Sequence, residues 1–324
     1  MRERPGTIDD TVVRDALRAW DIEPGTLDYA PVGFGDHHWI ASGAGRWFVT
    51  VADLADKEHC GTGTEAARRG LGRALETAVA LGGRPGLGFV VAPLRTAAGE
   101  SLRPLPDGRH AISVFPYLEG SAGRFGEELP EPRRVRALET LAALHTARPP
   151  AAVPVLRPEL PGRARLERAL RETGRPWSGG PFSEPARELL ADGGLRAPLE
   201  EFDRLVRRVR EGGAEPVVTH GEPHPGNLLW QGEEARLLDW DTVGLAVPER
   251  DLWLVAREPA DHARWTEKTG RTPDPAALAL YRLRWDLEDV TAFLGWFRSS
   301  HAEGPDTALA WEGFSATLER LTEG

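Results

Sequence analysis

The sequence has little cysteine and almost no lysine. Cys60 is the single cysteine among 324 residues, and Lys57 and Lys268 are the two lysines among 40 basic residues. A lone cysteine excludes an internal disulfide and a zinc cluster built from several thiolates. A chain without disulfides fits a reducing compartment, and we expect the cytoplasm.

Long apolar runs and excess positive charge are also missing. No stretch of about 18 uninterrupted apolar residues occurs, so we expect no membrane partner. The first ten residues carry charges with no apolar run behind them, unlike a secretory signal. Acidic residues outnumber basic ones by 50 to 40, and the formal net charge is −10. General nucleic-acid binding needs a basic face, which argues against a nucleic-acid partner. A protein with a net negative charge suits a cationic partner.

The composition that remains is that of a folded protein. Hydrophobic residues make up 40% and charged residues 28%, close to ordinary globular values. The 36 glycines and 27 prolines stay below the roughly 25–30% that marks low-complexity disorder. The length predicts two domains or two lobes sharing one core. We expect a monomer or homodimer.

The first part of the chain, residues 1–117, reads as a small sheet with inserted helices. Short runs rich in β-branched and aromatic residues are separated by glycine-containing turns. The pattern predicts helices at 7–20 and 64–81 and strands at 27–32, 38–42, 47–54, 89–93 and 110–115.

The remainder, residues 118–324, is mostly helical, with a strand cluster inside it. Helical periodicity predicts helices at 132–146, 163–172, 199–211, 248–257, 275–300 and 307–321, and strands at 216–219, 228–230 and 236–238. The sequence therefore predicts an α+β protein with a small β-rich N-terminal lobe and a larger, mostly helical C-terminal lobe.

The strand cluster contains the residues that suggest chemistry. From 217 to 253 it reads VVTHGEPHPGNLLWQGEEARLLDWDTVGLAVPERDLW. Phosphoryl transfer needs a carboxylate that orients the acceptor hydroxyl and oxygen ligands that hold Mg²⁺ against the phosphates. Glu222, Asn227 five residues later and Asp239 twelve residues beyond can supply these groups. Protein kinases use the same order of acid, asparagine and metal-binding aspartate.

HGExxxxN followed by LLDWD resembles the Brenner-type motif and the DFG-equivalent of the aminoglycoside phosphotransferase and choline kinase-like family. The resemblance implies a bilobal protein kinase-like fold, with ATP or GTP and Mg²⁺ as cofactors. By the same resemblance, His220 shapes the loop and Glu222 stands where the family's catalytic aspartate normally stands. Asn227 and Asp239 would be the metal ligands, and Asp251 in PERDLW would brace the catalytic loop.

The resemblance also implies nucleotide contacts in the first lobe. Phe115 and Tyr117 would belong to the hinge between the lobes that meets the adenine. Gly33 and Gly35 lie in GFGDHHW, between two predicted strands, where a phosphate-covering loop belongs. A bare Gly-x-Gly is also a common turn. Glu76, on the predicted helix 64–81, is the candidate for the family's pairing glutamate.

The sequence departs from the family pattern at two positions. Kinases of this type carry a lysine on the third strand, whereas RWFVTVADL has Thr50 at or next to that position. Lys57 is the only lysine of the first lobe and is expected to reach the phosphates from the following loop. Arg46 and Arg73 are the alternatives, although a planar guanidinium is not equivalent to a compact ammonium group.

The second departure is that Glu222 replaces aspartate. The side chain is one methylene longer, so the acceptor must lie farther out. A misplacement of about 1 Å costs on the order of a hundredfold in rate. The neighbouring prolines, Pro223 and Pro225, restrict the loop and favour a maintained shape.

The acceptor is expected to meet the terminal helices, where Trp285 and Asp289 are candidate contacts. An acid on an aromatic stripe suits a cationic or sugar-like ligand, although an amphipathic core helix explains the same pattern. The sequence thus predicts an ATP- and Mg²⁺-dependent O-phosphotransferase acting on a small-molecule hydroxyl, on an aminoglycoside-like or other antibiotic. The alternatives are a catalytically weakened nucleotide-binding pseudokinase and a metabolic kinase for an amino alcohol or sugar.

Overall fold

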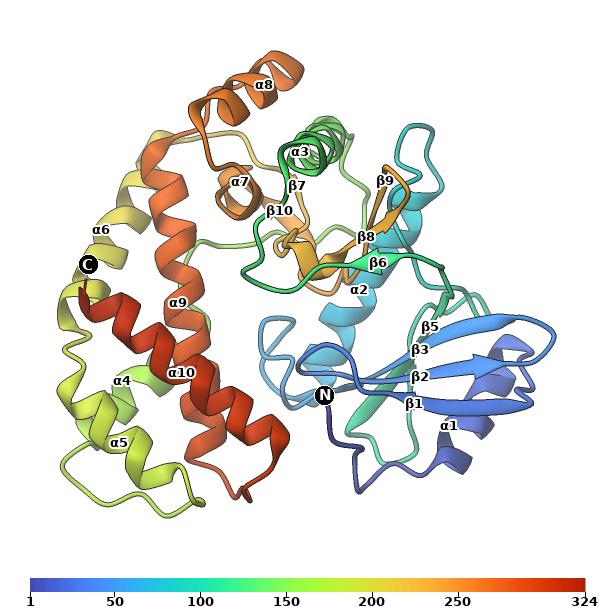
Figure 1. Ribbon diagram of the computed structural model, residues 1–324, viewed down its shortest axis with the longest axis horizontal. Helices are drawn as coiled ribbons and strands as arrows, with labels where there is room; N and C mark the ends of the chain where they lie inside the picture. The colour runs from blue at the N-terminus through green and yellow to red at the C-terminus, as the bar shows by residue number, and fades with distance from the viewer. Residues whose placement is uncertain (324) are drawn as a thin grey trace. The chain divides into compact units, whose positions relative to one another are not determined.

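The structure is a computed structural model that describes residues 1–323, with side chains to Thr322 (Figure 1). It contains two compact units, each formed from two stretches of the chain. The first unit comprises Met1–Arg157 and Glu215–Pro273, and the second comprises Pro158–Ala214 and the stretch from Asp274 onward. The α+β class, with a β-sheet N-terminal region and a helical C-terminal region, is confirmed. The predicted functional division into lobes at residues 117 and 118 stays a prediction.

An antiparallel five-stranded sheet, in the order β1-β2-β3-β5-β4, forms the N-terminal part of the first unit. Because side chains alternate along a strand, the sheet has two distinct faces. Val49 and Val51 pack with α1 on one face, whereas Ala52 packs with α2 on the other. The elements are α1 (Asp10–Leu17), η1 (Arg18–Trp20), β1 (Thr26–Ala30), β2 (His37–Ser42), β3 (Arg46–Asp53), α2 (Thr64–Gly82), β4 (Arg103–Pro104) and β5 (His110–Pro116).

The strand predicted at 89–93 is wrong. Val90 makes an isolated parallel bridge to Leu237, and the Leu237 amide donates to the carbonyl of Phe89. Pro93 lacks the N–H that a longer ladder needs. The segment therefore touches the second strand cluster at one point.

That second cluster contains the short strands that were predicted. It also contains β6 (Ser121–Ala122) and β10 (Gly244–Ala246), which were not predicted. β7 (Val217–Thr219) pairs with β10 (Gly244–Ala246), and a three-stranded sheet has the order β6-β8-β9. The remaining elements are β6 (Ser121–Ala122), η2 (Pro225–Asn227), β8 (Leu228–Gln231) and β9 (Glu234–Leu237).

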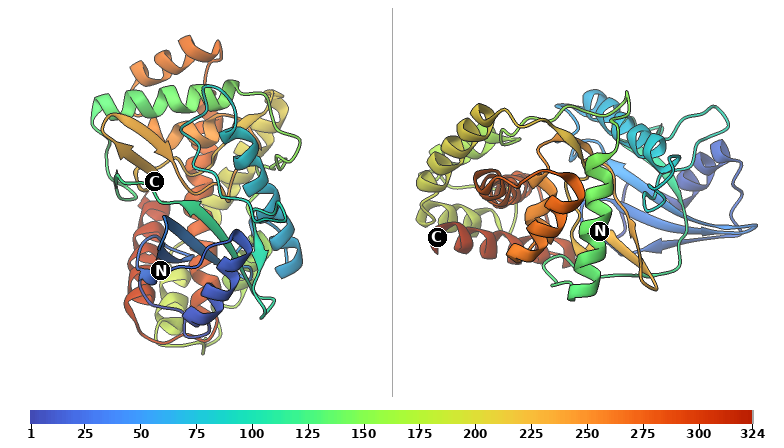
Figure 2. Two further views of the ribbon diagram at one scale, coloured as in Figure 1. Left: turned by 90° about the vertical axis from the view of Figure 1, so that its right-hand side faces the viewer. Right: turned by 90° about the horizontal axis from the view of Figure 1, so that it is seen from above.

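Three helices complete the first unit: α3 (Glu131–Thr146), α7 (Glu249–Val255) and α8 (Pro259–Thr269). Helix α3 packs against both α7 and α8, as the two further views show (Figure 2). Helix α8, which is short and polar, was not predicted from the sequence, and neither was α5 (Ser183–Asp192) in the second unit. The signals of α8 were Pro259 at the first position and Gly270, in a left-handed conformation, after the last.

The second unit is helical throughout its described residues. It comprises α4 (Arg163–Arg171), α5 (Ser183–Asp192), α6 (Arg196–Gly212), α9 (Pro275–Phe297) and α10 (Pro305–Glu323). Helix α9 packs against each of the other four. Within residues 1–323, no helix has both the length and the apolar character needed to cross a membrane.

Candidate active site

The loop that follows β7 has a glycine that the local packing requires. Gly221 has a φ of +105°, and a Cβ atom on it would collide with the guanidinium of Arg250. That guanidinium donates to Thr219 Oγ1 at 2.9 Å and to the carbonyl of Thr242 at 2.9 Å. The HGE motif therefore contains glycine for a steric reason, and the arginine of PERDLW holds the loop in place.

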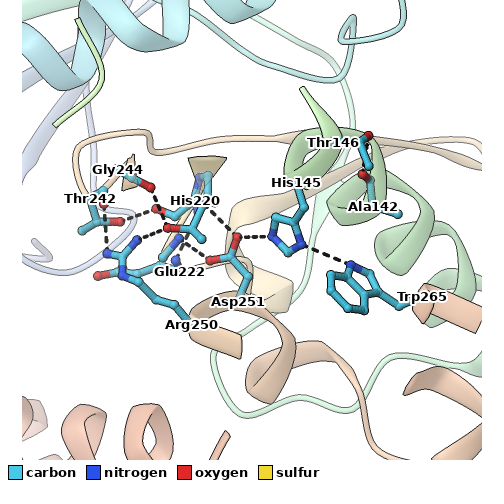
Figure 3. Close-up of polar contacts among 12 residues, drawn as sticks. Ala142, His145, Thr146, His220, Glu222, Thr242, Gly244, Arg250, Asp251 and Trp265 are labelled. Atoms are coloured by element: carbon cyan, nitrogen blue, oxygen red, sulfur yellow. Dashed lines mark hydrogen bonds and ion pairs between the residues drawn. The ribbon is translucent and has the colours of Figure 1, made fainter. Parts of the chain in front are cut away.

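Asp251 fastens the same loop through its backbone (Figure 3). Its Oδ2 accepts the His220 N–H at 2.8 Å, and its Oδ1 accepts the Gly221 N–H at 2.6 Å. His145 Nε2 lies 3.0 Å from Oδ2 as well. Burial alone would raise the pKa of Asp251, but the hydrogen bond from His145 and the nearby Arg250 hold that pKa below its usual value. Asp251 is therefore an ionised acceptor.

His220 ties the loop to the segment before Asp239. Its Nε2 donates to the carbonyl of Leu238 at 2.7 Å, and its Nδ1 accepts the Glu222 N–H at 3.2 Å. The side chain is completely buried, and this burial lowers the pKa of His220 to about 4. The imidazole is thus neutral at pH 7, and its two hydrogen bonds fix the tautomer.

Asn227 and Asp239 are brought together by the turn between them. The Leu238 N–H donates to the Asn227 backbone carbonyl at 2.9 Å. The Asn227 side-chain nitrogen donates to the Glu222 carbonyl at 3.0 Å and lies 3.3 Å from His224 Nε2. Both contacts use the amide nitrogen, so the amide oxygen is the atom that Asn227 can offer to a cation.

Asp239 has an unusual backbone and an unusual charge environment. Its φ of +59° lies in the left-handed region, which costs a non-glycine residue free energy and often marks functional sites. Desolvation and the neighbouring carboxylates of Asp241 and Glu222 hold the pKa of Asp239 well above its usual value. Because the residue is exposed, we attribute the shift chiefly to the like charges, which act without burial.

Lys57 reaches this cluster from the loop after β3. Its Nζ lies 2.7 Å from Asp241 Oδ2 and 2.9 Å from Asp36 Oδ2, and Asp36 belongs to the GFGD loop. His59 Nε2 is 3.3 Å from the same oxygen of Asp241. Burial would lower the pKa of Lys57, but Asp241 and Asp36 hold it well above its usual value. The ammonium group therefore remains charged although only 9% of the residue is exposed.

Acidic side chains outnumber basic ones around Lys57. The carboxylates of Asp36, Glu222, Asp239 and Asp241 act on one another, with Lys57 and His59 as the cations among them. Burial, followed by the charge of Asp241, raises the pKa of Glu222 to about 7. Asp36 Oδ1 is buried without a hydrogen-bond partner among the described residues. Such a cluster favours a cationic ligand.

The donor set fits a divalent cation that is shared with a second ligand. Within the described residues, no group of three or more histidine, cysteine or acidic side chains is arranged to hold a metal. Mg²⁺ commonly takes one or two protein oxygens and completes its shell with phosphates and water. Asp239 and Asn227 suit that arrangement.

The other predicted nucleotide contacts lie in the GFGD loop and at the end of β5. Gly33 and Gly35 have φ values of +71° and +97°, so the GFGD loop uses the freedom of glycine. Phe115 pairs with Phe48 in the sheet. Arg46 lies 3.7 Å from the ring centroid of Tyr117. The adenine contacts of Phe115 and Tyr117 stay predictions.

Glu76 does not take part in the pairing typical of the family. Its carboxylate binds Arg95 at 2.6 Å, whereas Lys57 binds Asp36 and Asp241. The expected lysine–glutamate pair is replaced because Lys57 approaches from a loop rather than from β3. Arg73, an alternative cation, donates to the carbonyl of Ala152 instead.

Trp285 and Asp289 lie on α9 in the second unit, and their predicted contact with the acceptor stays a prediction. Four residues that the structure connects to the site had not been predicted from the sequence: Asp36, His59, His145 and Trp265. Asp36 was visible as the acid of GFGD. The other three gave no sequence signal, because their partners are distant in the chain.

Comparisons with known proteins agree with this geometry. A family model described as the phosphotransferase enzyme family matches residues 42–297. The chain is similar in structure to a spectinomycin phosphotransferase solved with ADP and spectinomycin, with a TM-score of 0.68, 16% identity and coverage of 97% of this chain and 98% of that one. No curated protein matches the chain in sequence.

Two further solved structures are similar. A microcompartment-associated aminopropanol kinase has a TM-score of 0.62 and 15% identity, with 97% of this chain and 96% of the other covered. An amicoumacin kinase, solved with AMP-PNP, Ca²⁺ and its antibiotic, has a TM-score of 0.56 and 12% identity, with 96% and 93% covered. At these identities the likeness shows the fold.

Proposed function

Because the chain belongs to the phosphotransferase enzyme family, we propose that it transfers a phosphoryl group from ATP or GTP to a hydroxyl group of a small molecule. The observation that supports this most strongly is the cluster of Glu222, Asp239 and Asp241 around Lys57, in which each charge acts on the others. Groups that can serve as a base, a metal ligand and a cation for the phosphates therefore interact with one another.

In this proposal, each residue has a separate task. Glu222 accepts the proton of the acceptor hydroxyl, and a pKa of about 7 suits a base that works near neutral pH. Lys57 contacts the phosphates in place of the missing strand lysine, after they displace Asp36. Asp239 and Asn227 would hold Mg²⁺, which supplies the positive charge that the phosphates need during transfer.

The acceptor class follows from the charge of the site and from the neighbours. The excess of carboxylates favours an acceptor with a positive charge. The similar proteins include enzymes named for spectinomycin, amicoumacin and aminopropanol. We therefore propose an antibiotic as the acceptor, with an amino alcohol as the second candidate because of the aminopropanol kinase.

The test is an acceptor screen with coupled detection of ADP. Spectinomycin, amicoumacin, aminoglycosides, macrolides, aminopropanol, choline and sugars are each incubated with MgATP or MgGTP and the protein. We expect one acceptor to raise ADP release, and Asp239→Asn to remove that increase. Calorimetry of nucleotide binding completes the test, because binding without turnover on any acceptor would indicate a pseudokinase instead.

A further inference from the structure

A chain of hydrogen bonds joins α8 to the catalytic loop (Figure 3). It runs from Trp265 to His145 on α3, then to Asp251, and from Asp251 to the backbone of His220 and Gly221. We propose that Trp265 is a positioning residue, which acts through His145 and Asp251 to set the orientation of the loop that carries Glu222. This inference rests on the proposed phosphotransferase function.

The direction of each hydrogen bond follows from donor chemistry. An indole N–H only donates, and Trp265 Nε1 lies 3.1 Å from His145 Nδ1. Nδ1 must therefore be the unprotonated nitrogen, and the ring proton is on Nε2. Nε2 faces Asp251 Oδ2 at 3.0 Å and donates to it. Trp265 thus selects the tautomer of His145 that can bind Asp251.

Water does not compete with this chain of bonds. Trp265 is 1% exposed, and the side chains of His145 and Asp251 are completely buried. The two rings of Trp265 and His145 meet edge to face, with centroids 5.8 Å apart and planes at 73°. In such surroundings, a lost donor is not replaced by solvent, and the remaining groups must rearrange.

Loss of the Trp265 donor affects the loop that carries Glu222 through Asp251. Without the indole donor, Nδ1 of His145 is a buried acceptor that has lost its hydrogen bond. The imidazole is then free to turn in search of another donor, and its Nε2–H moves out of line with the carboxylate. Asp251 is the acceptor for two successive backbone N–H groups, of His220 and Gly221. A shift of the carboxylate therefore shifts the residues immediately before Glu222.

The competing explanation is that Trp265 only fills space between α8 and α3, which pack together. Trp265→Phe separates the two explanations, because phenylalanine retains an aromatic ring and removes the donor. We measure ADP release from MgATP with water as the phosphoryl acceptor and with the acceptor that the screen identifies. In both reactions, we expect kcat to fall about tenfold. The KM for ATP is expected to stay within about twofold, because the residues proposed to contact the nucleotide are not part of this chain of bonds.

Trp230→Phe is the matched control. Trp230 on β8 is 3% exposed, and its indole N–H has no hydrogen-bond acceptor among the described residues. The same atoms are removed from a buried site, but no hydrogen bond is lost. We expect its kcat to equal that of the wild type. An equal fall in both variants would overturn the proposal in favour of packing.

A double-mutant cycle sharpens the result. In His145→Gln, the amide nitrogen takes the place of Nε2 and donates to Asp251 without help from Trp265. Adding Trp265→Phe to this variant should lower kcat less than twofold. His145→Asn does not reach Asp251 and should lose at least as much kcat as Trp265→Phe. The same tenfold loss from Trp265→Phe in the wild-type and His145→Gln backgrounds would contradict the proposal.

Hydrogen exchange tests the structural step without any turnover. The amides of His220 and Gly221 should exchange about tenfold faster in Trp265→Phe than in the wild type or in Trp230→Phe. Faster exchange in a protein that transfers no phosphoryl group would support the positioning role and refute the proposed function. Unchanged exchange in Trp265→Phe would overturn the positioning role whatever the activity.

Discussion

Asp251 and Asp241 are carboxylates of the same compact unit, but their surroundings differ in charge balance. Asp251 accepts hydrogen bonds from two backbone amides and from His145, and its pKa is set by burial, by His145 and by the positive charge of Arg250. Asp241 binds Lys57 and His59 and also acts on Glu222 and Asp239. The region around Asp251 therefore favours one fixed shape, whereas the region around Asp241 retains repulsion that a bound cation would relieve.

The largest expected effect comes from Asp239→Asn. We expect kcat for phosphoryl transfer to fall at least about a thousandfold, because the metal loses its charged ligand. The free energy of unfolding should stay the same or rise, since a like charge leaves the cluster. Urea denaturation and coupled ADP detection measure the two quantities.

Asp251→Asn is the corresponding substitution in the region around Asp251. An amide cannot accept all three donors, so we expect the free energy of unfolding to fall by about 3 kcal/mol. Both substitutions replace a carboxylate by an isosteric amide. A fall in the free energy of unfolding in both variants would show that the two carboxylates do not differ in this way.

Glu222→Gln should have the next largest effect, a loss of about a hundredfold in kcat. Nucleotide affinity should change little, because the side chain is proposed to contact the acceptor. In the wild type, kcat/KM should rise as the pH increases through about 7, since the pKa of Glu222 is raised to about 7 and only the ionised form accepts a proton. A pH profile of Glu222→Gln that keeps this rise would assign it to another group.

Lys57→Met should have the smallest effect on turnover, but a clear effect on binding and stability. We expect the KM for ATP to rise about tenfold, or ~1.4 kcal/mol. Removing one partner from a buried ion pair costs about 3–5 kcal/mol, because Asp36 and Asp241 lose their shared cation. Adding Asp36→Asn should restore part of the stability and none of the nucleotide affinity.

Lys268→Met provides the control for Lys57→Met. Lys268 is the other lysine of the chain, and it is exposed on α8. We expect wild-type stability and a wild-type KM for ATP. A rise in the KM for both variants would indicate a general effect of net charge rather than a contact between Lys57 and the phosphates.

The sequence predicted the fold class and most of the elements, because alternation and helical periodicity are local signals. It failed at 89–93, where an apolar run makes one bridge rather than a strand. It also failed at the short helices α5 and α8, and in α8 Trp265 is the buried aromatic residue of a polar helix. The spacing of Glu222, Asn227 and Asp239 marked the candidate site. The partners of Lys57 and His145 could not be foreseen, since they lie up to 184 residues away along the chain.

The backbone of Asp239 has an evolutionary consequence. A left-handed conformation suits glycine better than aspartate, and asparagine would remove a like charge from the cluster. The acid at this position is therefore unfavourable for stability. Selection for catalysis is what would preserve it. Descendants of this protein that no longer transfer phosphoryl groups should therefore drift toward glycine or asparagine at position 239, and they should gain stability as they do so.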